Sequence, residues 1–130
     1  MKILLDTNVL ISAFIFGGQA GCLLSVLFES EHQLYVSDYI DREFKAKLED
    51  KWPEKADRVY GLYRRMDFIF CESAEEMQGQ LRDEKDIPVL SDALHHHIDI
   101  ILTGDKDFLE AELEYPLIYS PKMLLEYLGL

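Results

Sequence analysis

The sequence has few of the features that mark several common protein classes. Only two of its 130 residues are cysteines, Cys22 and Cys71, so no disulfide framework is indicated and we expect reduced thiols. Its uninterrupted apolar runs are far shorter than the ~20 residues that span a bilayer. Asp6 and Asn8 interrupt the N-terminal apolar run, which therefore does not resemble the core of a signal peptide. We expect a cytoplasmic protein that does not enter a membrane.

Basic residues are scarce relative to acidic ones. The chain has 13 lysines and arginines and 25 aspartates and glutamates, which gives a formal net charge of −12 with neutral histidines. Because such a surface repels other polyanions at long range, a general nucleic-acid coat protein is not expected. If nucleic acid is a partner, it must be bound by a local basic segment or through metal ions.

One segment departs from this acidic average. Residues 41–67, which we call the basic arm, contain eight basic and seven acidic residues, whereas the rest of the chain contains five and eighteen. We predict contacts with a polyanion from five side chains of the arm: Lys47, Lys51, Lys55, Arg64 and Arg65. The alternative is that the arm consists of ordinary helix faces with salt bridges between neighbouring side chains.

Several sequence motifs of well-known enzymes are missing. The chain has no GxGxxG, Walker A, GxSxG or HExxH motif, so dinucleotide-binding, P-loop, serine-hydrolase and zincin functions lack support. Three consecutive histidines, His95, His96 and His97, invite a metal site. Consecutive residues of a helix point about 100° apart, so the three cannot all face one ion. We interpret them as surface or helix-end residues.

Short β-rich runs alternate with helical stretches along the chain. The predicted strands are Lys2–Asp6, Gln33–Ser37, Asp67–Cys71, Asp99–Thr103 and Pro116–Tyr119. The predicted helices are Asn8–Phe16, Ala20–Ser30, Asp38–Asp50 with Asp38 as N-cap, Glu54–Met66, one that begins at Pro88, and Pro121–Leu128. This alternation predicts a single doubly wound α/β domain over residues 1–130, with a mainly parallel sheet between layers of helices.

Acidic residues stand where the predicted strands end. Asp6 ends the first strand, and Asp105 and Asp107 follow the fourth. In an open parallel sheet, ligands bind beyond the carboxyl ends of the strands. Each of these acids is also a good N-cap for a following helix, and taken singly the cap is the better explanation.

Two further acids join this set as candidates. Glu43 lies on the flank of an apolar helix face that contains Ile40 and Phe44, and Asp86 precedes the helix that begins at Pro88. Exposure to solvent or helix capping explains each of them alone. We interpret the neighbouring Asp83 and Glu84 as solvated loop acids.

A cluster of these carboxylates requires a compensating charge. If Asp6, Glu43, Asp86 and Asp105 converge, their repulsion raises some of their pKa values and destabilises the fold. A divalent cation removes this cost, and an all-oxygen set of ligands favours Mg²⁺ or Mn²⁺ over zinc. Short polar residues at the same strand ends can orient the carboxylates: Thr7, Asn8, Ser37 and Thr103.

Four segments that contain these acids resemble a PIN domain in their sequence and order. They are LLDTNVLISAF with Asp6, SDYIDREF with Glu43, DEKDIPVLSDAL with Asp86, and DIILTGDKDFL with Asp105. The closing segment PLIYSPKMLLEYL resembles the end of the bacterial and archaeal subgroup described as toxin components of toxin–antitoxin pairs (VapC-like). Asp92 and the three histidines depart from this subgroup, which usually has small residues in that helix.

The resemblance implies both a fold and an activity. It implies a five-stranded parallel sheet ordered 3-2-1-4-5, with Asp6 beside Asp105. It also implies a ribonuclease that depends on Mg²⁺ or Mn²⁺, is commonly dimeric, acts on RNA and is silenced by a cognate antitoxin. Carried over by residue, Asp6, Glu43, Asp86 and Asp105 are the catalytic and metal-binding acids, Asp107 is an additional metal ligand, and the basic arm contacts RNA.

Two other functions remain open from the sequence. A catalytically weak PIN-like module could keep the same scaffold and bind a partner protein or RNA without cutting it. A phosphatase or receiver-type domain also collects acids at strand ends. It would need a phosphate-accepting aspartate after the third strand, where Cys71 and Glu72 stand instead.

Overall fold

The computed structural model describes residues 1–75, 86–111 and 113–130, so Asp83 and Glu84 lie outside the described residues. The strands are β1 (Lys2–Leu5), β2 (Gln33–Ser37), β3 (Ile69–Cys71), β4 (Ile100–Leu102) and β5 (Leu117–Tyr119). The helices are α1 (Thr7–Ile11), α2 (Gly18–Phe28), α3 (Asp38–Lys51), α4 (Ala56–Arg64), α5 (Ile87–His95), α6 (Lys106–Leu109) and α7 (Pro121–Tyr127), and Ser12–Phe16 forms a π-helix, η1.

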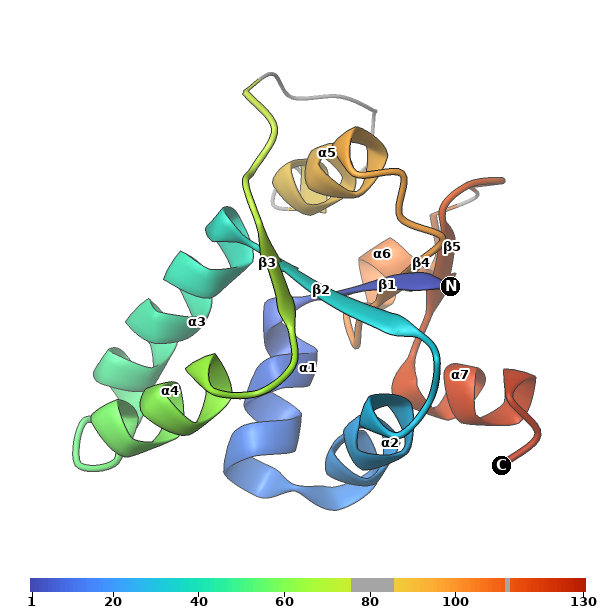
Figure 1. Cartoon of the computed structure of the whole chain (residues 1–130). Helices are drawn as coiled ribbons and strands as arrows, with labels where there is room; N and C mark the ends of the chain where they lie inside the picture. Colours follow the sequence, from blue (N-terminus) through green and yellow to red (C-terminus); the bar gives the residue numbers. More distant parts are fainter. Residues whose placement is uncertain (76–85, 112) are drawn as a thin grey trace.

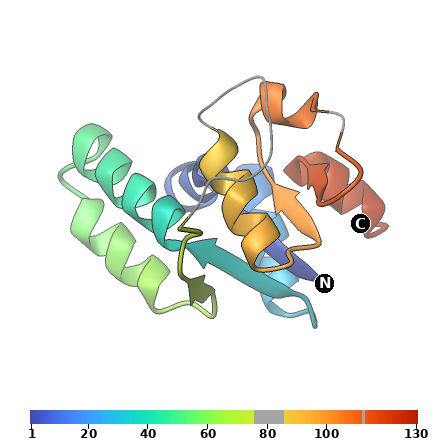
Figure 2. The same ribbon diagram turned by 90° about the horizontal axis from the view of Figure 1, so that it is seen from above.

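The five strands form one parallel sheet in the order β3-β2-β1-β4-β5. Leu4 of β1 pairs with Tyr35 of β2 on one side and with Ile101 of β4 on the other. Figures 1 and 2 show α5 over one face of the sheet and α1, α2 and α7 over the other, with the α3–α4 pair beside β2 and β3. The predicted α/β class, strand order and layering are confirmed.

The central strands are buried because they are apolar along their whole length. Ile3, Leu4 and Leu5 of β1 and all three residues of β4 are almost inaccessible to solvent. Continuous apolar runs of this kind are typical of parallel strands covered on both faces by helices. The carboxyl ends of β1 and β4 therefore lie side by side at the centre of one edge of the sheet, and their positions are fixed by the core.

A second part of the core joins the α3–α4 pair to the sheet. Tyr63 of α4 is fully buried, and its ring contacts those of Phe14, Phe44 and Phe68. Its hydroxyl donates a hydrogen bond of 2.8 Å to Asp41 of α3. Burial and this carboxylate raise the pKa of Tyr63 far above its ordinary value, so the phenol stays neutral and remains a donor.

The structure corrects three expectations about local elements. The N-cap of α3 is Ser37, whose hydroxyl accepts from the backbone N–H of Ile40, whereas Asp38 is already helical. The expected helix Asn8–Phe16 divides into α1 and η1 and ends where Gly17 takes a φ of +74°, a conformation that glycine adopts without strain. The four-residue α6 was not expected, because so short a helix shows no periodicity.

No single helix of the described ranges is long and apolar enough to cross a bilayer. The adjoining segments Thr7–Phe16 and Gly18–Phe28 meet the length and composition criteria only when combined, and they are bent by 101° at their junction.

Candidate active site

Asp6 is buried at the end of β1, with 6% of its surface exposed and both carboxylate oxygens bound. Its Oδ1 accepts a 2.8 Å hydrogen bond from the backbone N–H of Thr7, and its Oδ2 accepts a 2.7 Å bond from Thr103 Oγ1. Its own N–H donates to the carbonyl oxygen of Leu102 at 2.9 Å. Main chain and side chain of Asp6 are thus fixed at the junction of β1 and β4.

Burial raises the pKa of the Asp6 carboxyl above its ordinary value. The hydrogen bonds from Thr103 and Thr7 oppose this change, and the nearby carboxylates of Glu43 and Asp105 add to it. The ionised form of Asp6 is therefore costly, because it is poorly solvated and has two acidic neighbours. A positive charge at this place would stabilise it.

Glu43 and Asp86 approach the same place from α3 and from the start of α5. Tyr39, one turn before Glu43, donates its hydroxyl to Glu43 Oε2 at 3.4 Å. Burial raises the pKa of Tyr39, and the carboxylates of Glu43, Asp6 and Asp86 raise it further, so its hydroxyl is within electrostatic range of three of the predicted acids. Asp86 is 5% exposed, and its side chain does not cap α5.

Asp105 serves as a helix cap and lies within electrostatic range of Asp6. Its Oδ1 accepts from the backbone N–H of Asp107 at 2.9 Å, which caps α6, and its own N–H donates to Thr103 Oγ1 at 3.1 Å. Thr103 is fully buried and thus connects Asp6 and Asp105 through one hydroxyl. Asp107 itself lies on α6 with an exposed side chain.

The other predicted supporting residues have different surroundings. Thr7 is buried, and within the described part of the chain its Oγ1 has no hydrogen-bond partner. Asn8 is exposed and lines a cavity of about 640 Å³ together with Gly104 and Lys122. Ser37 is buried, and its hydroxyl caps α3 and binds no carboxylate among the described residues. Thr103 therefore makes the most direct contact with the acids.

The chemistry of this donor set fits Mg²⁺ or Mn²⁺. Asp6, Glu43, Asp86 and Asp105 offer only carboxylate oxygens, the ligands that these hard cations prefer. As they stand, no three histidine, cysteine, aspartate or glutamate side chains among the described residues are close enough to hold a metal ion. The support for a cation thus comes from the donor types and from the unfavourable burial of Asp6.

Two polar residues that the sequence analysis did not assign to the site lie next to it. Asp92 of α5 is 2% exposed and accepts hydrogen bonds from Ser73 Oγ at 3.0 Å and from the N–H of Ala74 at 2.7 Å. Ser73 Oγ accepts in turn from the N–H of Tyr39 at 2.8 Å. The spacing of Tyr39 and Glu43 by four residues is a local signal for their contact, whereas no local signal connects Tyr39 with Ser73 or Asp92.

The three histidines are not part of any group of described residues that could hold a metal ion, although the rings of His95 and His96 contact each other. His95 is at the end of α5, and His97 follows the helix with a φ of +55°. His96 Nε2 donates to the carbonyl oxygen of Glu72 and so helps Asp92 to fix the chain after β3. Their interpretation as helix-end residues agrees with this placement.

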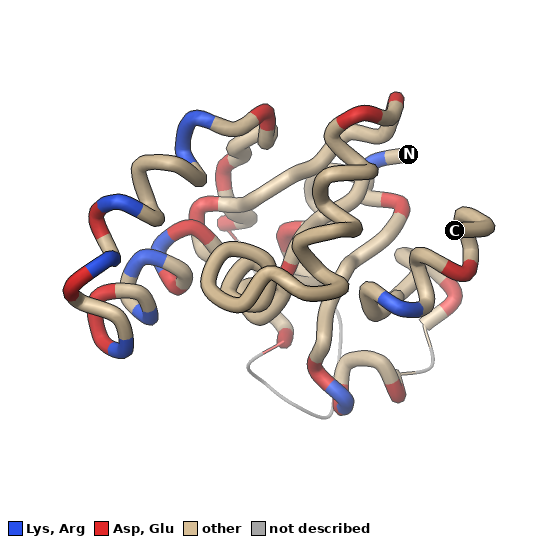
Figure 3. The backbone as a smooth tube through the Cα atoms, turned by 90° about the horizontal axis from the view of Figure 1, so that it is seen from below, with Lys and Arg blue, Asp and Glu red and all other residues tan. Residues whose placement is uncertain are grey.

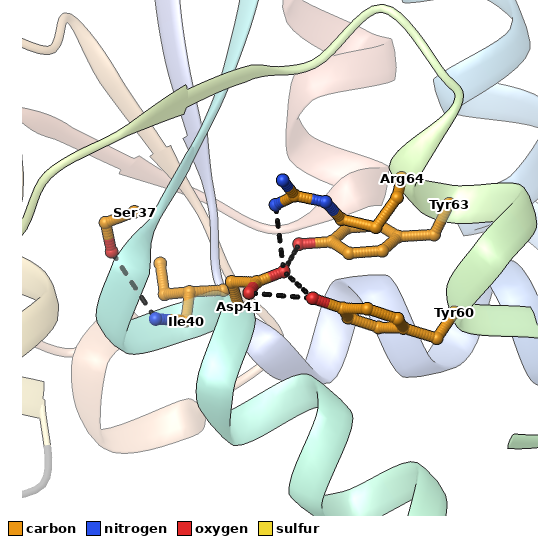
Figure 4. Close-up of polar contacts among 6 residues, drawn as sticks. All are labelled: Ser37, Ile40, Asp41, Tyr60, Tyr63 and Arg64. Atoms are coloured by element: carbon orange, nitrogen blue, oxygen red, sulfur yellow. Dashed lines mark hydrogen bonds and ion pairs between the residues drawn. The ribbon is translucent and has the colours of Figure 1, made fainter. Parts of the chain in front are cut away.

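The basic arm carries most of the lysine and arginine residues, interspersed with acidic ones (Figure 3). Arg64 forms an ion pair with Asp41 at 3.5 Å and lies over the ring of Phe70 at 3.9 Å, and Figure 4 shows its contact with Asp41. Arg65 Nε donates to the carbonyl oxygen of Gly61. In the part of the chain that the structure describes, no ion pair engages the three predicted lysines: Lys47, Lys51 and Lys55.

Comparison with known proteins identifies the family. Residues 2–107 match the family described as the PIN domain. A chain in the crystal structure of VapBC2 from Rickettsia felis bound to a DNA fragment from their promoter has a similar fold, with a TM-score of 0.73 and 12% sequence identity over 92% of this chain and 98% of that chain. No curated protein matches the sequence. Because the family match covers most of the residues, including the segments of Asp6, Glu43, Asp86 and Asp105, this chain belongs to the PIN domain family.

Proposed function

We propose that this chain is an endoribonuclease that depends on Mg²⁺ or Mn²⁺ and that it acts in the cytoplasm as the toxin of a toxin–antitoxin pair. The observation that carries the proposal is the placement of Asp6, buried at the junction of β1 and β4 with Glu43 and Asp105 close enough to raise its pKa. Membership of the PIN domain family supports the same activity.

The proposed roles follow from the positions of the side chains. Asp6 and Asp105 hold the cation from two adjacent strands, and Glu43 and Asp86 complete the site from α3 and α5. When bound there, a divalent cation supplies an activated water and neutralises the charge that develops at the scissile phosphate. Thr103 keeps the Asp6 carboxylate in one orientation through its 2.7 Å hydrogen bond. Asp107, at the exposed start of α6, is an additional ligand in this proposal.

We place the RNA on the basic arm, beside Glu43. The three lysines of the arm, which lack ion pairs within the described ranges, are the stronger candidates for phosphate contacts. Arg64 and Arg65 already contact their own chain and must give up or share these contacts to bind RNA. The resemblance to toxin components and the shared fold with a chain of the VapBC2 structure support a cognate antitoxin as partner. The proposed homodimer rests on the sequence resemblance alone.

Incubation with RNA tests the activity. We expect cleavage of a panel of single-stranded and structured RNAs with Mn²⁺ or Mg²⁺ and none with EDTA. Asp6→Asn and Asp105→Asn should lower the rate by on the order of 10²–10³, as the loss of one transition-state stabiliser does. Glu31→Gln is the control, because Glu31 is exposed, lies outside the basic arm and precedes β2 at the opposite end of the sheet.

The outcome also separates the two candidate functions. Cleavage that persists in EDTA, or in Asp6→Asn at the wild-type rate, contradicts the metal-dependent mechanism and indicates a contaminating nuclease. RNA binding without cleavage in any metal supports the alternative, a catalytically weak PIN-like module that binds RNA or a partner protein.

A further inference from the structure

The hydroxyl of Tyr39 contacts Glu43, one of the four predicted metal-binding acids. Tyr39 lies in the first turn of α3 and directs its hydroxyl to Glu43 Oε2, 3.4 Å away on the next turn of the same helix. Asp6 and Asp86 lie near enough to interact electrostatically with the same hydroxyl. Carboxylates only accept hydrogen bonds, so among these acids the phenol is a donor.

The main chain of Tyr39 is held by a second set of contacts. Its N–H donates to Ser73 Oγ at 2.8 Å, and the hydroxyl of Ser73 donates to Asp92 Oδ2 at 3.0 Å. Asp92 is nearly inaccessible and also receives the N–H of Ala74. A chain of hydrogen bonds thus runs from α5 through the segment after β3 to the first turn of α3, and it ends at Glu43.

We propose that Tyr39 is a positioning residue that orients the carboxylate of Glu43, and that Ser73 and Asp92 hold Tyr39 in place. Glu43 is the one acid of the four that stands in the middle of a long helix, with three rotatable bonds between its carboxylate and the backbone. A donor from the preceding turn limits these rotations and directs the carboxylate toward Asp6. The catalytic consequence of this arrangement rests on the function proposed above.

The expected effect is that of losing a group that orients a metal ligand. Such losses typically lower metal affinity or activity about 10–100-fold. Tyr39→Phe removes only the phenol oxygen and leaves the ring and the N–H that binds Ser73. Ser73→Ala removes the acceptor for that N–H and leaves the phenol.

The chain offers a matched control in Tyr60. Its hydroxyl donates to both carboxylate oxygens of Asp41, at 3.0 and 3.1 Å, so it also binds an acid of α3 (Figure 4). Tyr60→Phe makes the same chemical change at a place where neither Asp6 nor Glu43 takes part. It is expected to affect folding stability but not the site.

Two measurements test the proposal on the full chain. In metal-free protein labelled with ¹³C-glutamate, the Cδ resonance of Glu43 should move in Tyr39→Phe and in Ser73→Ala but not in Tyr60→Phe. In a titration with Mn²⁺ followed by calorimetry, the dissociation constant should rise about 10–100-fold in Tyr39→Phe and stay within about twofold in Tyr60→Phe. Tyr39→Phe combined with Ser73→Ala should be little worse than the more severe single change, because both act through one chain of contacts.

The two measurements distinguish a failure of the positioning role of Tyr39 from a failure of the proposed function. A Glu43 resonance unchanged in Tyr39→Phe overturns the positioning role whether or not the protein binds metal. If the resonance moves but wild type binds no Mn²⁺ and cleaves no RNA, positioning is supported and the proposed function fails. If wild type binds Mn²⁺ and Tyr39→Phe binds it equally well, the role of Tyr39 in the metal site is refuted while the proposed function stands.

Discussion

Asp6→Asn exchanges a buried carboxylate for an amide of the same size and removes one negative charge beside Glu43 and Asp105. Because burial raises the pKa of Asp6 in the folded protein, its ionised form destabilises the fold at any pH above that pKa. This destabilisation is absent below the ordinary value of the unfolded chain and grows as the pH rises toward the raised value. The amide carries no charge and does not incur this cost.

The asparagine amide keeps only part of the hydrogen bonding that stabilises the Asp6 carboxylate. One amide oxygen cannot accept from both Thr7 N–H and Thr103 Oγ1, and the loss of one charge-assisted hydrogen bond costs about 1.5–3 kcal/mol. The two effects have opposite signs, so in EDTA at pH 7 we expect them to offset each other in part. Relative to wild type, the variant should become more stable as the pH is raised above about 4, where the unfolded chain loses its proton first.

Wild type and Asp6→Asn should differ in how much Mn²⁺ stabilises them. Wild type should gain about 2.7 kcal/mol in Mn²⁺ at a hundredfold excess over the dissociation constant, or about 10 °C in melting temperature for a chain of this length. Asp6→Asn should gain almost nothing. Thermal melts of both proteins, in EDTA and in Mn²⁺, give the four values. If Mn²⁺ does not stabilise wild type and Asp6→Asn melts lower in EDTA, Asp6 is a structural helix cap and the metal-site argument is refuted.

Three further predictions use other contacts. Thr103→Val should lower the free energy of unfolding by roughly 2 kcal/mol, because Asp6 and the N–H of Asp105 each lose a hydrogen-bond partner. A urea titration that shows no loss of stability would contradict this. Tyr63→Phe should cost about 1–2 kcal/mol in the same assay, since the Asp41 carboxylate loses its shortest hydrogen bond. Replacing Lys47, Lys51 and Lys55 by glutamine should lower the slope of log K for RNA against log salt by up to about 2, and an unchanged slope would show that these lysines do not contact phosphate.

The sheet could be predicted from the sequence because its central strands are continuous apolar runs, and the resemblance to PIN domains gave their order. Asp6 and Asp105 were expected to be neighbours because they follow adjacent parallel strands, and the structure places them so. Residues such as Ser73 and Asp92 could not be found in this way. Their contacts join positions 18 to 34 residues apart, and neither periodicity nor strand ends indicate such contacts.

The pairing of β1 with β4 has a consequence for protein synthesis. Asp6 leaves the ribosome well before two of the groups that bind it, because Leu102 O and Thr103 Oγ1 follow 96 and 97 positions later. At about 5–20 residues per second, a nascent chain carries an incomplete site for roughly 5–20 s. Until β4 has emerged and inserted beside β1, the Asp6 carboxylate stays solvated and separated from Asp105. A truncated product that ends before Ile100 would therefore contain Asp6 and Glu43 but no assembled centre, whatever metal surrounds it.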